Sequence, residues 1–245
     1  MGLEFARQLA ESGYRVMMVS NREAELQDAA KAITADFGVQ AEALCIDLAS
    51  EGSAESVLGW CDSLGLEVDV LVNNAGCFFM KYLEPADLPR VRTMMSLHMD
   101  VVTELCVLVG DRMKRRGSGH ILNMSSMTAR IPAPGISIYS ATKAYLKSFG
   151  KSFSHEMRPY GVYVTTVCPS AVDTGLYPLG DKLRRVLKRC GIIRSPEWLV
   201  RKALRALFGG RRTLSPGLTN ALLPPLIAIA PDSLIDKLGV RWIAR

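Results

Sequence analysis

Three residues near the middle of the chain have the types and spacing for acid–base chemistry on a carbonyl group. In the stretch SSMTARIPAPGISIYSATKAY, Tyr139 and Lys143 are four positions apart, so in a helix they share one face. Ser126 lies thirteen positions before Tyr139, at the end of an apolar run. A Tyr-x-x-x-Lys pair alone is more often a surface pair. Together with Ser126 and a turn-rich connector, the pair indicates a catalytic site.

The expected chemistry follows from the tyrosine hydroxyl. A free tyrosine has a pKa of about 10, too high for proton exchange near neutrality. A lysine ammonium about 4 Å away stabilises the tyrosinate by roughly 4 kcal/mol at an effective dielectric near 20, or about three pKa units. We therefore expect Tyr139 to act as general acid in reduction and as general base in oxidation. Ser126 would hydrogen-bond the substrate oxygen and stabilise charge developing there.

The elements that must position these side chains alternate along the chain. Apolar strands separated by helices predict a parallel sheet covered on both faces, hence an α/β fold. The expected strands are Val16–Ser20, Val39–Asp47, Val68–Asn74, Gly119–Ser126 and Val162–Pro169. The expected helices include Glu23–Phe37, Ser53–Leu64, Asp87–Arg116 and Ser137–Arg158. With no repeat or linker, we expect one domain, residues 1–245, in which 214–245 form an apolar helical extension.

Small, polar or turn-forming residues follow each expected strand. Parallel sheets of this kind bind ligands at the carboxyl ends of their strands. A site is therefore expected just after the following residues: Ser20, Asp47, Asn74, Ser126 and Pro169.

The composition narrows the class of protein. The chain has 245 residues, of which 49% are hydrophobic and 22% charged, as in an ordinary globular domain. Six cysteines are scattered, and with three histidines they show no metal-ligand spacing, so we expect no metal. No apolar run looks long enough to cross a bilayer and no signal peptide is apparent. We therefore expect a cytoplasmic protein.

The net charge of +6 is uneven. The stretch Asp181–Arg194 holds six basic residues and one acidic residue. Such a run is usually a solvated helix face, and the alternative is a basic patch that attracts an anionic substrate or cofactor. No nucleic-acid motif accompanies it, so nucleic acid is not an expected partner.

Several short motifs occur in the order and spacing of a known family. The chain from Gly2 to about Thr174 resembles the short-chain dehydrogenase/reductase family, on the motifs Asn73-Asn74-Ala75-Gly76, Ser126, Tyr139-x-x-x-Lys143 and Pro169-Ser170-Ala171-Val172-Asp173-Thr174. The resemblance implies a Rossmann-like, doubly wound parallel sheet. It also implies hydride transfer between a nicotinamide cofactor and a carbonyl or alcohol carbon.

The resemblance gives each matching residue a role. Ser126, Tyr139 and Lys143 match the catalytic triad, and Lys143 would also hold the nicotinamide ribose. The remaining matches contact the cofactor: Gly2, Asn21, Arg22, Asp47 at the adenine, Asn74, Ala75 and Gly76 beside the adenosine half, and Pro169, Val172 and Thr174 over the nicotinamide amide.

Two positions depart from the family pattern. His98 stands where the family usually has an asparagine. Its imidazole either takes part in catalysis, through a backbone carbonyl or a relay water, or is merely a buried histidine with satisfied hydrogen bonds. Pro169-Ser170 replaces a proline-glycine pair, which stiffens the loop.

The beginning of the sequence departs more strongly. The family's phosphate loop, Thr-Gly-x-x-x-Gly-x-Gly, follows a first strand, and Met1-Gly2 matches only its last two positions. We therefore expect an N-terminally truncated sheet in which two strands that would flank the first strand lack a partner. Because the loop supplies backbone N–H groups to the pyrophosphate, weak cofactor binding or poor folding is also expected.

The cofactor is expected to be NADP, with NAD as the alternative. Arg22 follows the Val16–Ser20 strand, where relatives that prefer NAD carry an acidic residue, and its guanidinium suits a 2′-phosphate. The alternative is that Arg22 only caps the next helix.

The expected substrate is a small molecule with a carbonyl group, apolar and conceivably lipid-like. Apolar residues flank the site: Cys77–Met80, Met127, Ile131–Pro132 and Leu176–Pro178. The tail 218–245 covers the pocket, packs on a partner subunit or lies on a membrane surface.

By resemblance, the chain forms a homodimer or homotetramer through the helices around 101–113 and 141–153. The alternative function is a catalytically impaired nucleotide-binding or scaffold protein of the same fold.

Overall fold

The computed structural model describes residues 1–131, 133–174, 185, 193–233 and 235–236. Most of the basic stretch Asp181–Arg194 lies outside the described residues, and so do Pro132, Leu176–Pro178 and residues 237–245.

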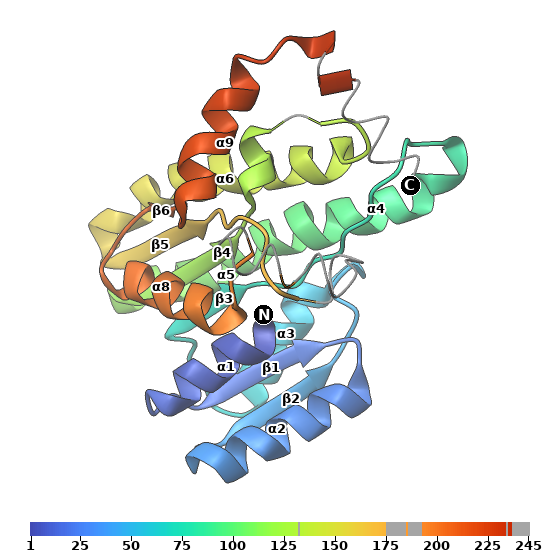
Figure 1. Cartoon of the computed structure of the whole chain (residues 1–245). Coiled ribbons are helices and arrows are strands. Elements are labelled where there is room, and N and C mark those ends of the chain that lie inside the picture. The colour runs from blue at the N-terminus through green and yellow to red at the C-terminus, as the bar shows by residue number, and fades with distance from the viewer. Residues whose placement is uncertain (132, 175–184, 186–192, 234, 237–245) are drawn as a thin grey trace.

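The strands form two parallel sheets between layers of helices, which confirms the Rossmann-like α/β fold (Figure 1). In the first sheet β1 pairs with β2, and the second has the order β3-β4-β5-β6. The strands are β1 Val16–Ser20, β2 Ala41–Cys45, β3 Val70–Asn73, β4 Gly119–Met124, β5 Val162–Val167 and β6 Thr213–Leu214. Several expected strands were too long at their carboxyl ends, because the residues there leave the ladder, and after β3, β4 and β5 they turn toward the site.

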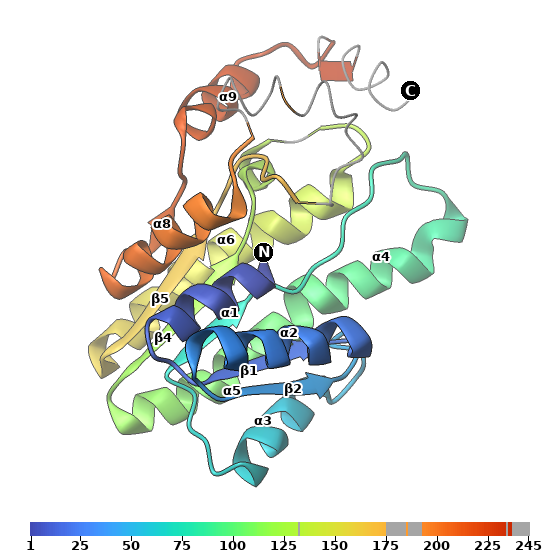
Figure 2. The ribbon, with the colours of Figure 1, turned by 60° about the horizontal axis from the view of Figure 1, so that its bottom comes forward.

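The division between the two sheets lies between β1 and β3. Among the described strands, β1 pairs only with β2 and β3 pairs only with β4, so each has one side without a strand. Figure 2 shows α2, β1 and β2 on one side of this division, and α1 contacts both sides, with Phe5 packed against the larger sheet and Ala6 against β1. The arrangement agrees with the expectation of two strands that lack a common neighbour.

Helices cover both faces of the larger sheet because its strands alternate. On β4, Ile121 packs with α3, α5 and α6, whereas Leu122 packs with α1 and α8 on the opposite face. The helices are α1 Gly2–Glu11, α2 Glu23–Phe37, α3 Ser53–Ser63, α4 Leu88–Met95, α5 Val101–Arg116, α6 Ser137–Met157, α8 Pro196–Phe208 and α9 Leu218–Ala228.

The long helix expected between β3 and β4 contains a bend. A π-helical turn, Ser96–Asp100, joins α4 to α5 and carries His98 into the interior. By length and composition, the run Pro85–Arg116, whose most apolar 18-residue window has a mean hydropathy of 1.3, is long enough to cross a membrane, contrary to the sequence-based expectation. Its most apolar window is 44% buried, and residues of α5 belong to the main core.

One glycine allows α6 to lie close to the sheet. A Cβ atom built on Gly150 would lie 2.0 Å from Thr166 Oγ1 on β5. Only a residue without a side chain therefore permits this approach, which places the first turns of α6 over the ends of β4 and β5.

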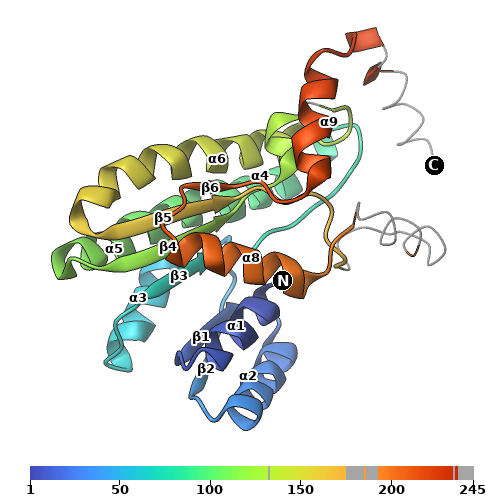
Figure 3. The ribbon, with the colours of Figure 1, turned by 60° about the vertical axis from the view of Figure 1, so that its left-hand side comes forward.

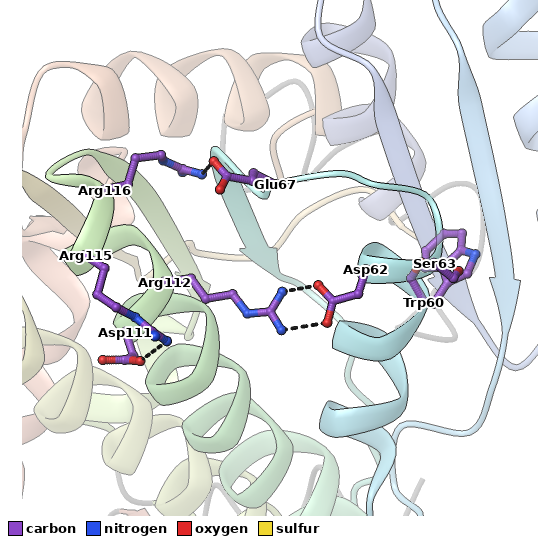
Figure 4. A network of polar contacts seen from close by, with 8 residues as sticks. All are labelled: Trp60, Asp62, Ser63, Glu67, Asp111, Arg112, Arg115 and Arg116. Carbon is purple, nitrogen blue, oxygen red and sulfur yellow. Dashed lines mark hydrogen bonds and ion pairs between the residues drawn. The ribbon is translucent and has the colours of Figure 1, made fainter.

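Charged side chains join α3 to α5 at the opposite end of the sheet from the strand exits (Figure 4). Arg112 donates from its two terminal guanidinium nitrogens to the two carboxylate oxygens of Asp62, and Arg116 binds Glu67 at 2.7 Å. These pairs line a hollow of about 750 Å³. Because the acidic partners are largely exposed, such pairs contribute little stability.

Candidate active site

A cavity of about 420 Å³ opens at the carboxyl ends of β3, β4 and β5. Three of its lining side chains are Ser126, Tyr139 and Lys143, so the structure brings the expected triad together. The other lining residues are Met1, Arg22, Asn74, Gly76, Cys77, His98, Met124, Ser125, Pro169, Ser170, Val172 and Thr174.

Tyr139 lies in the first turn of α6 and is only 6% exposed. Its ring meets Phe78 edge-to-face, with the centroids 4.9 Å apart, and meets His98 at 5.8 Å. These aromatic contacts fix the plane of the tyrosine ring. The phenol is thereby held at one position on the cavity wall.

Lys143 lies one turn later on the same face of α6 and is buried. Its Nζ donates a hydrogen bond to the Met124 carbonyl at 3.0 Å and lies 5.6 Å from the centroid of the Tyr139 ring. Burial lowers the pKa of Lys143 to about 8. The side chain is still mostly an ammonium at pH 7, as the expected chemistry requires.

A second bond joins the same two segments. Ser125 Oγ donates to the Lys143 carbonyl at 2.6 Å, while the Lys143 ammonium donates to Met124. The end of β4 and the first turns of α6 are thus bonded in both directions. Sequence reasoning missed Met124 and Ser125, because neither their types nor their spacing distinguishes them from ordinary strand residues.

Ser126 follows β4 and begins the short 3₁₀ turn Met127–Arg130. Its Oγ accepts a hydrogen bond from the Thr128 backbone N–H at 3.2 Å. This cap keeps the hydroxyl on the cavity side of the turn.

His98 is 1% exposed, and both of its ring nitrogens have partners. Nε2 lies 3.1 Å from the Cys77 backbone nitrogen, and Nδ1 lies 2.9 Å from Thr142 Oγ1. Burial, followed by the charge of Lys143, lowers the pKa of His98 to about 3. The imidazole is therefore neutral at physiological pH. Thr142 was not identified from the sequence.

At the cavity, the loop after β3 lies close to His98 and to the start of α1. A Cβ atom built on Gly76 would lie 2.8 Å from His98 Nε2. A Cβ atom on Gly2, at the start of α1, would lie 3.1 Å from Asn74 Nδ2. Gly2 thus contacts the loop without lining the cavity, and Ala75 is exposed beside it.

Arg22 lines the cavity although its side chain is 71% exposed. Its guanidinium pairs with Glu25 at 3.2 Å, one turn along α2. Arg22 therefore precedes α2, pairs with a side chain of that helix and also borders the cavity.

The loop after β5 is held by backbone bonds to a distant segment. The Asp173 N–H donates to the Arg194 carbonyl at 2.9 Å, and the Arg194 N–H donates to the Ala171 carbonyl at 3.1 Å. These bonds keep the lining residues Pro169, Val172 and Thr174 at the cavity.

Besides Gly2 and Ala75, two further expected cofactor contacts lie apart from the cavity lining. Asp47 is exposed, and its carboxylate accepts from the Ala49 N–H at 3.0 Å. Asn21 is also exposed. Among the described residues, no group of three or more His, Cys, Asp or Glu side chains is arranged to hold a metal ion.

The chain shares its sequence pattern with known oxidoreductases. The sequence profile of the family described as short chain dehydrogenase matches residues 1–179. The human very-long-chain 3-oxoacyl-CoA reductase is 30% identical over 97% of this chain and 74% of its own length. The very-long-chain 3-oxoacyl-CoA reductase-A of Danio rerio is 30% identical over 98% of this chain and 74% of its own.

Solved structures show the same fold. A 7β-hydroxysteroid dehydrogenase superposes with a TM-score of 0.85 at 22% identity, covering 97% of this chain and 93% of its own. A short-chain dehydrogenase from Sphingobium yanoikuyae, in complex with NADPH, superposes with a TM-score of 0.77 at 25% identity, covering 96% and 91%.

The expectation of a cytoplasmic protein is wrong. The curated relatives are named for very-long-chain acyl substrates. Each buried methylene of an acyl chain favours a lipid phase over water by about 0.8 kcal/mol, so molecules of this kind reside in membranes. The relatives therefore contradict an assignment to the aqueous cytoplasm.

The match over residues 1–179 covers most of the chain and includes each segment that forms the triad. The chain belongs to the short-chain dehydrogenase family and is an oxidoreductase.

Proposed function

We propose that the chain reduces the carbonyl group of a long-chain, lipid-like substrate with NADPH. The observation that carries the proposal is the single cavity shared by Ser126, Tyr139 and Lys143. The names of the curated relatives support a 3-oxoacyl thioester as the substrate class. The apolar side chains of Cys77 and Met124 in the cavity wall suit such a chain.

The cavity has groups that fit a nicotinamide dinucleotide. The backbone of Gly76 passes near the buried Lys143 ammonium. That ammonium would hold the ribose hydroxyls. Arg22 would hold a 2′-phosphate, and the first backbone N–H groups of α1, beside Asn74, are suited to a phosphate. The bound cofactor supplies the hydride.

The side chains of the triad transfer the proton to the substrate oxygen. Ser126 Oγ orients the substrate oxygen, and Tyr139 donates its phenolic hydrogen to that oxygen as negative charge develops. The Lys143 ammonium then stabilises the resulting tyrosinate. The buried rings of Phe78 and His98 keep the phenol in place during this transfer.

The test is NADPH consumption with 3-oxoacyl-CoA substrates of increasing chain length, compared with a small ketone. We expect kcat/KM to rise with chain length, and Tyr139→Phe to abolish turnover while NADPH binding persists. Tyr145→Phe is the matched control, because the Tyr145 hydroxyl bonds Thr103 at 2.7 Å, outside the cavity lining. Turnover retained by Tyr139→Phe would refute the assignment of the acid.

Arg22 provides a separate test of the cofactor. Arg22→Ala should weaken NADPH binding about tenfold and leave NADH binding unchanged, because only NADPH carries the 2′-phosphate. Arg15→Ala is the control, since Arg15 pairs with Glu42 at 2.8 Å and does not line the cavity. Equal losses for both cofactors would contradict the NADP assignment.

The surface that suits an anionic lipid bilayer is α9. Leu218, Leu222, Leu226 and Ile229 form one helical stripe and are 59–81% exposed. Figure 3 shows α9 projecting outward from the sheet and its covering helices, and the net charge of +6 complements anionic headgroups. Leu222→Glu should reduce co-sedimentation with anionic vesicles, whereas Leu88→Glu, an exposed control at the start of α4 and outside the expected subunit contacts, should not. Vesicle-independent self-association through the stripe would favour a second copy instead.

A further inference from the structure

The hydrogen bonds around His98 determine where its ring hydrogen lies. The Cys77 backbone N–H can only donate, so Nε2 is the acceptor and carries no hydrogen. In a neutral ring the hydrogen is then on Nδ1, which faces Thr142 Oγ1 at 2.9 Å. The Thr142 hydroxyl donates in turn to the Tyr139 carbonyl at 2.9 Å. Every donor in this series has one acceptor.

The series joins two parts of the site that are far apart in sequence. One end is the loop Gly76–Cys77 after β3, and the other is the first turn of α6, which carries Tyr139. A Cβ atom on Gly76 would lie 2.8 Å from His98 Nε2 and 3.8 Å from Lys143 Nζ. The imidazole therefore sets how closely the loop approaches the lysine.

We propose that His98 is a positioning residue, a neutral Nδ1–H imidazole that ties the Gly76–Cys77 loop to the catalytic turn of α6 and carries no proton in the reaction. Its effect on turnover rests on the proposed reductase function, whereas its hydrogen-bonded state does not. The sequence left two interpretations of His98, a catalytic histidine or a buried histidine with satisfied hydrogen bonds. The structure shows a satisfied histidine whose hydrogen-bond partners belong to the catalytic elements.

The charges around the ring agree with this role. Among the residues that the structure describes, the ionisable groups facing it are Lys143 and Tyr139 from α6 and Cys77 from the loop. Burial raises the pKa of the Cys77 thiol, which is therefore neutral at physiological pH. The Lys143 ammonium is positive and opposes a second positive charge on the imidazole.

The decisive measurement is a histidine ¹⁵N–¹H spectrum of the wild-type chain, with the His98 signals identified by their absence in His98→Asn. We expect the Nδ1–H tautomer with no titration between pH 5 and pH 8. The Nε2–H tautomer, or a titration in that range, would overturn the proposal. This readout needs no enzyme activity, so it tests the hydrogen-bonded state of His98 even if the chain proves not to be a reductase.

A matched pair at Thr142 tests the coupling to catalysis. Thr142→Val keeps the shape but removes the acceptor for Nδ1–H, and should lower kcat about tenfold with little change in KM. Thr142→Ser retains the hydroxyl and should restore kcat. Equal kcat for both variants would overturn the positioning role.

The pH profile separates positioning from proton relay. His98→Phe, which removes both hydrogen bonds of the imidazole and is not the asparagine usual in the family, should lower kcat while the pH values at which kcat inflects remain those of the wild type. A shift of about one pH unit or more in an inflection of the kcat–pH profile would show that the imidazole exchanges protons, which would contradict the proposal.

Discussion

Lys143 is held in its charged form at a cost to the fold. Burial lowers its pKa from 10.5 to about 8. The folded chain therefore binds fewer protons at this site than the unfolded chain, and below pH 8 the buried ammonium reduces the free energy of unfolding by about 3 kcal/mol. The reduction diminishes as the pH rises from 8 toward 10.5. Lys143→Met removes the titrating group and keeps a side chain of similar length.

The expected result is a difference that depends on pH. Between pH 7 and pH 9, the free energy of unfolding of the wild type should rise by about 1 kcal/mol relative to Lys143→Met. The variant also loses the bond to the Met124 carbonyl, which costs roughly 1–3 kcal/mol at every pH. Only the pH-dependent part therefore reports on the ammonium. Turnover in the variant should be lost, because the charge beside Tyr139 is gone.

Urea denaturation followed by tryptophan fluorescence at pH 7, 8 and 9 measures the difference. Lys151→Met, at an exposed position of α6, controls for the loss of one positive charge. For the unfolding measurements both chains carry Tyr139→Phe, so that the catalytic tyrosine adds no titration of its own, and measurements stop at pH 9, before ordinary tyrosine side chains titrate. A difference between wild type and Lys143→Met that stays constant over this range would refute the argument that burial disfavours the ammonium.

Three further predictions concern the elements around the site. Gly150→Ala should destabilise the fold by roughly 2 kcal/mol because its Cβ would lie 2.0 Å from Thr166 Oγ1. Gly59→Ala, in the middle of α3, is the control: its Cβ would have no neighbour within 4 Å, so it should be neutral or stabilising in the same urea assay. Gly76→Ala should lower cofactor affinity by displacing His98 from its contacts, and titration with NADPH should detect it; unchanged affinity would refute the close approach. Arg112→Ala should cost no more than about 1 kcal/mol, and the loss should shrink at high salt, because the pair with Asp62 is exposed.

The sequence was sufficient for the parts of the site that local geometry determines. Tyr139 and Lys143 share a face because four residues span one helical turn. Ser126 reaches them because the exits of parallel strands meet at one edge of a sheet. The alternation of apolar runs likewise predicted β1 to β5 and most of the helices, but not the two-residue strand β6.

The rest depends on contacts that no local pattern encodes. The state of His98 follows from bonds to Cys77 and Thr142, 21 and 44 residues away. The acceptor for Lys143 is a backbone carbonyl, which any residue at position 124 would supply. Arg22 pairs with Glu25 in α2 and also borders the cavity, a combination that its place in the sequence does not reveal. Charge and composition do not encode cellular location, which is why the cytoplasmic expectation was wrong.

The paired bonds between the end of β4 and α6 have a mechanical consequence. Lys143 donates to Met124, and Ser125 donates back to the Lys143 carbonyl, so the two segments form a closed ring of bonded atoms. A ring of this kind resists sliding of the helix along the strand in either direction. We therefore expect Ser126, the next residue in the chain, to move together with α6, so that motion of the helix changes the distances within the triad little.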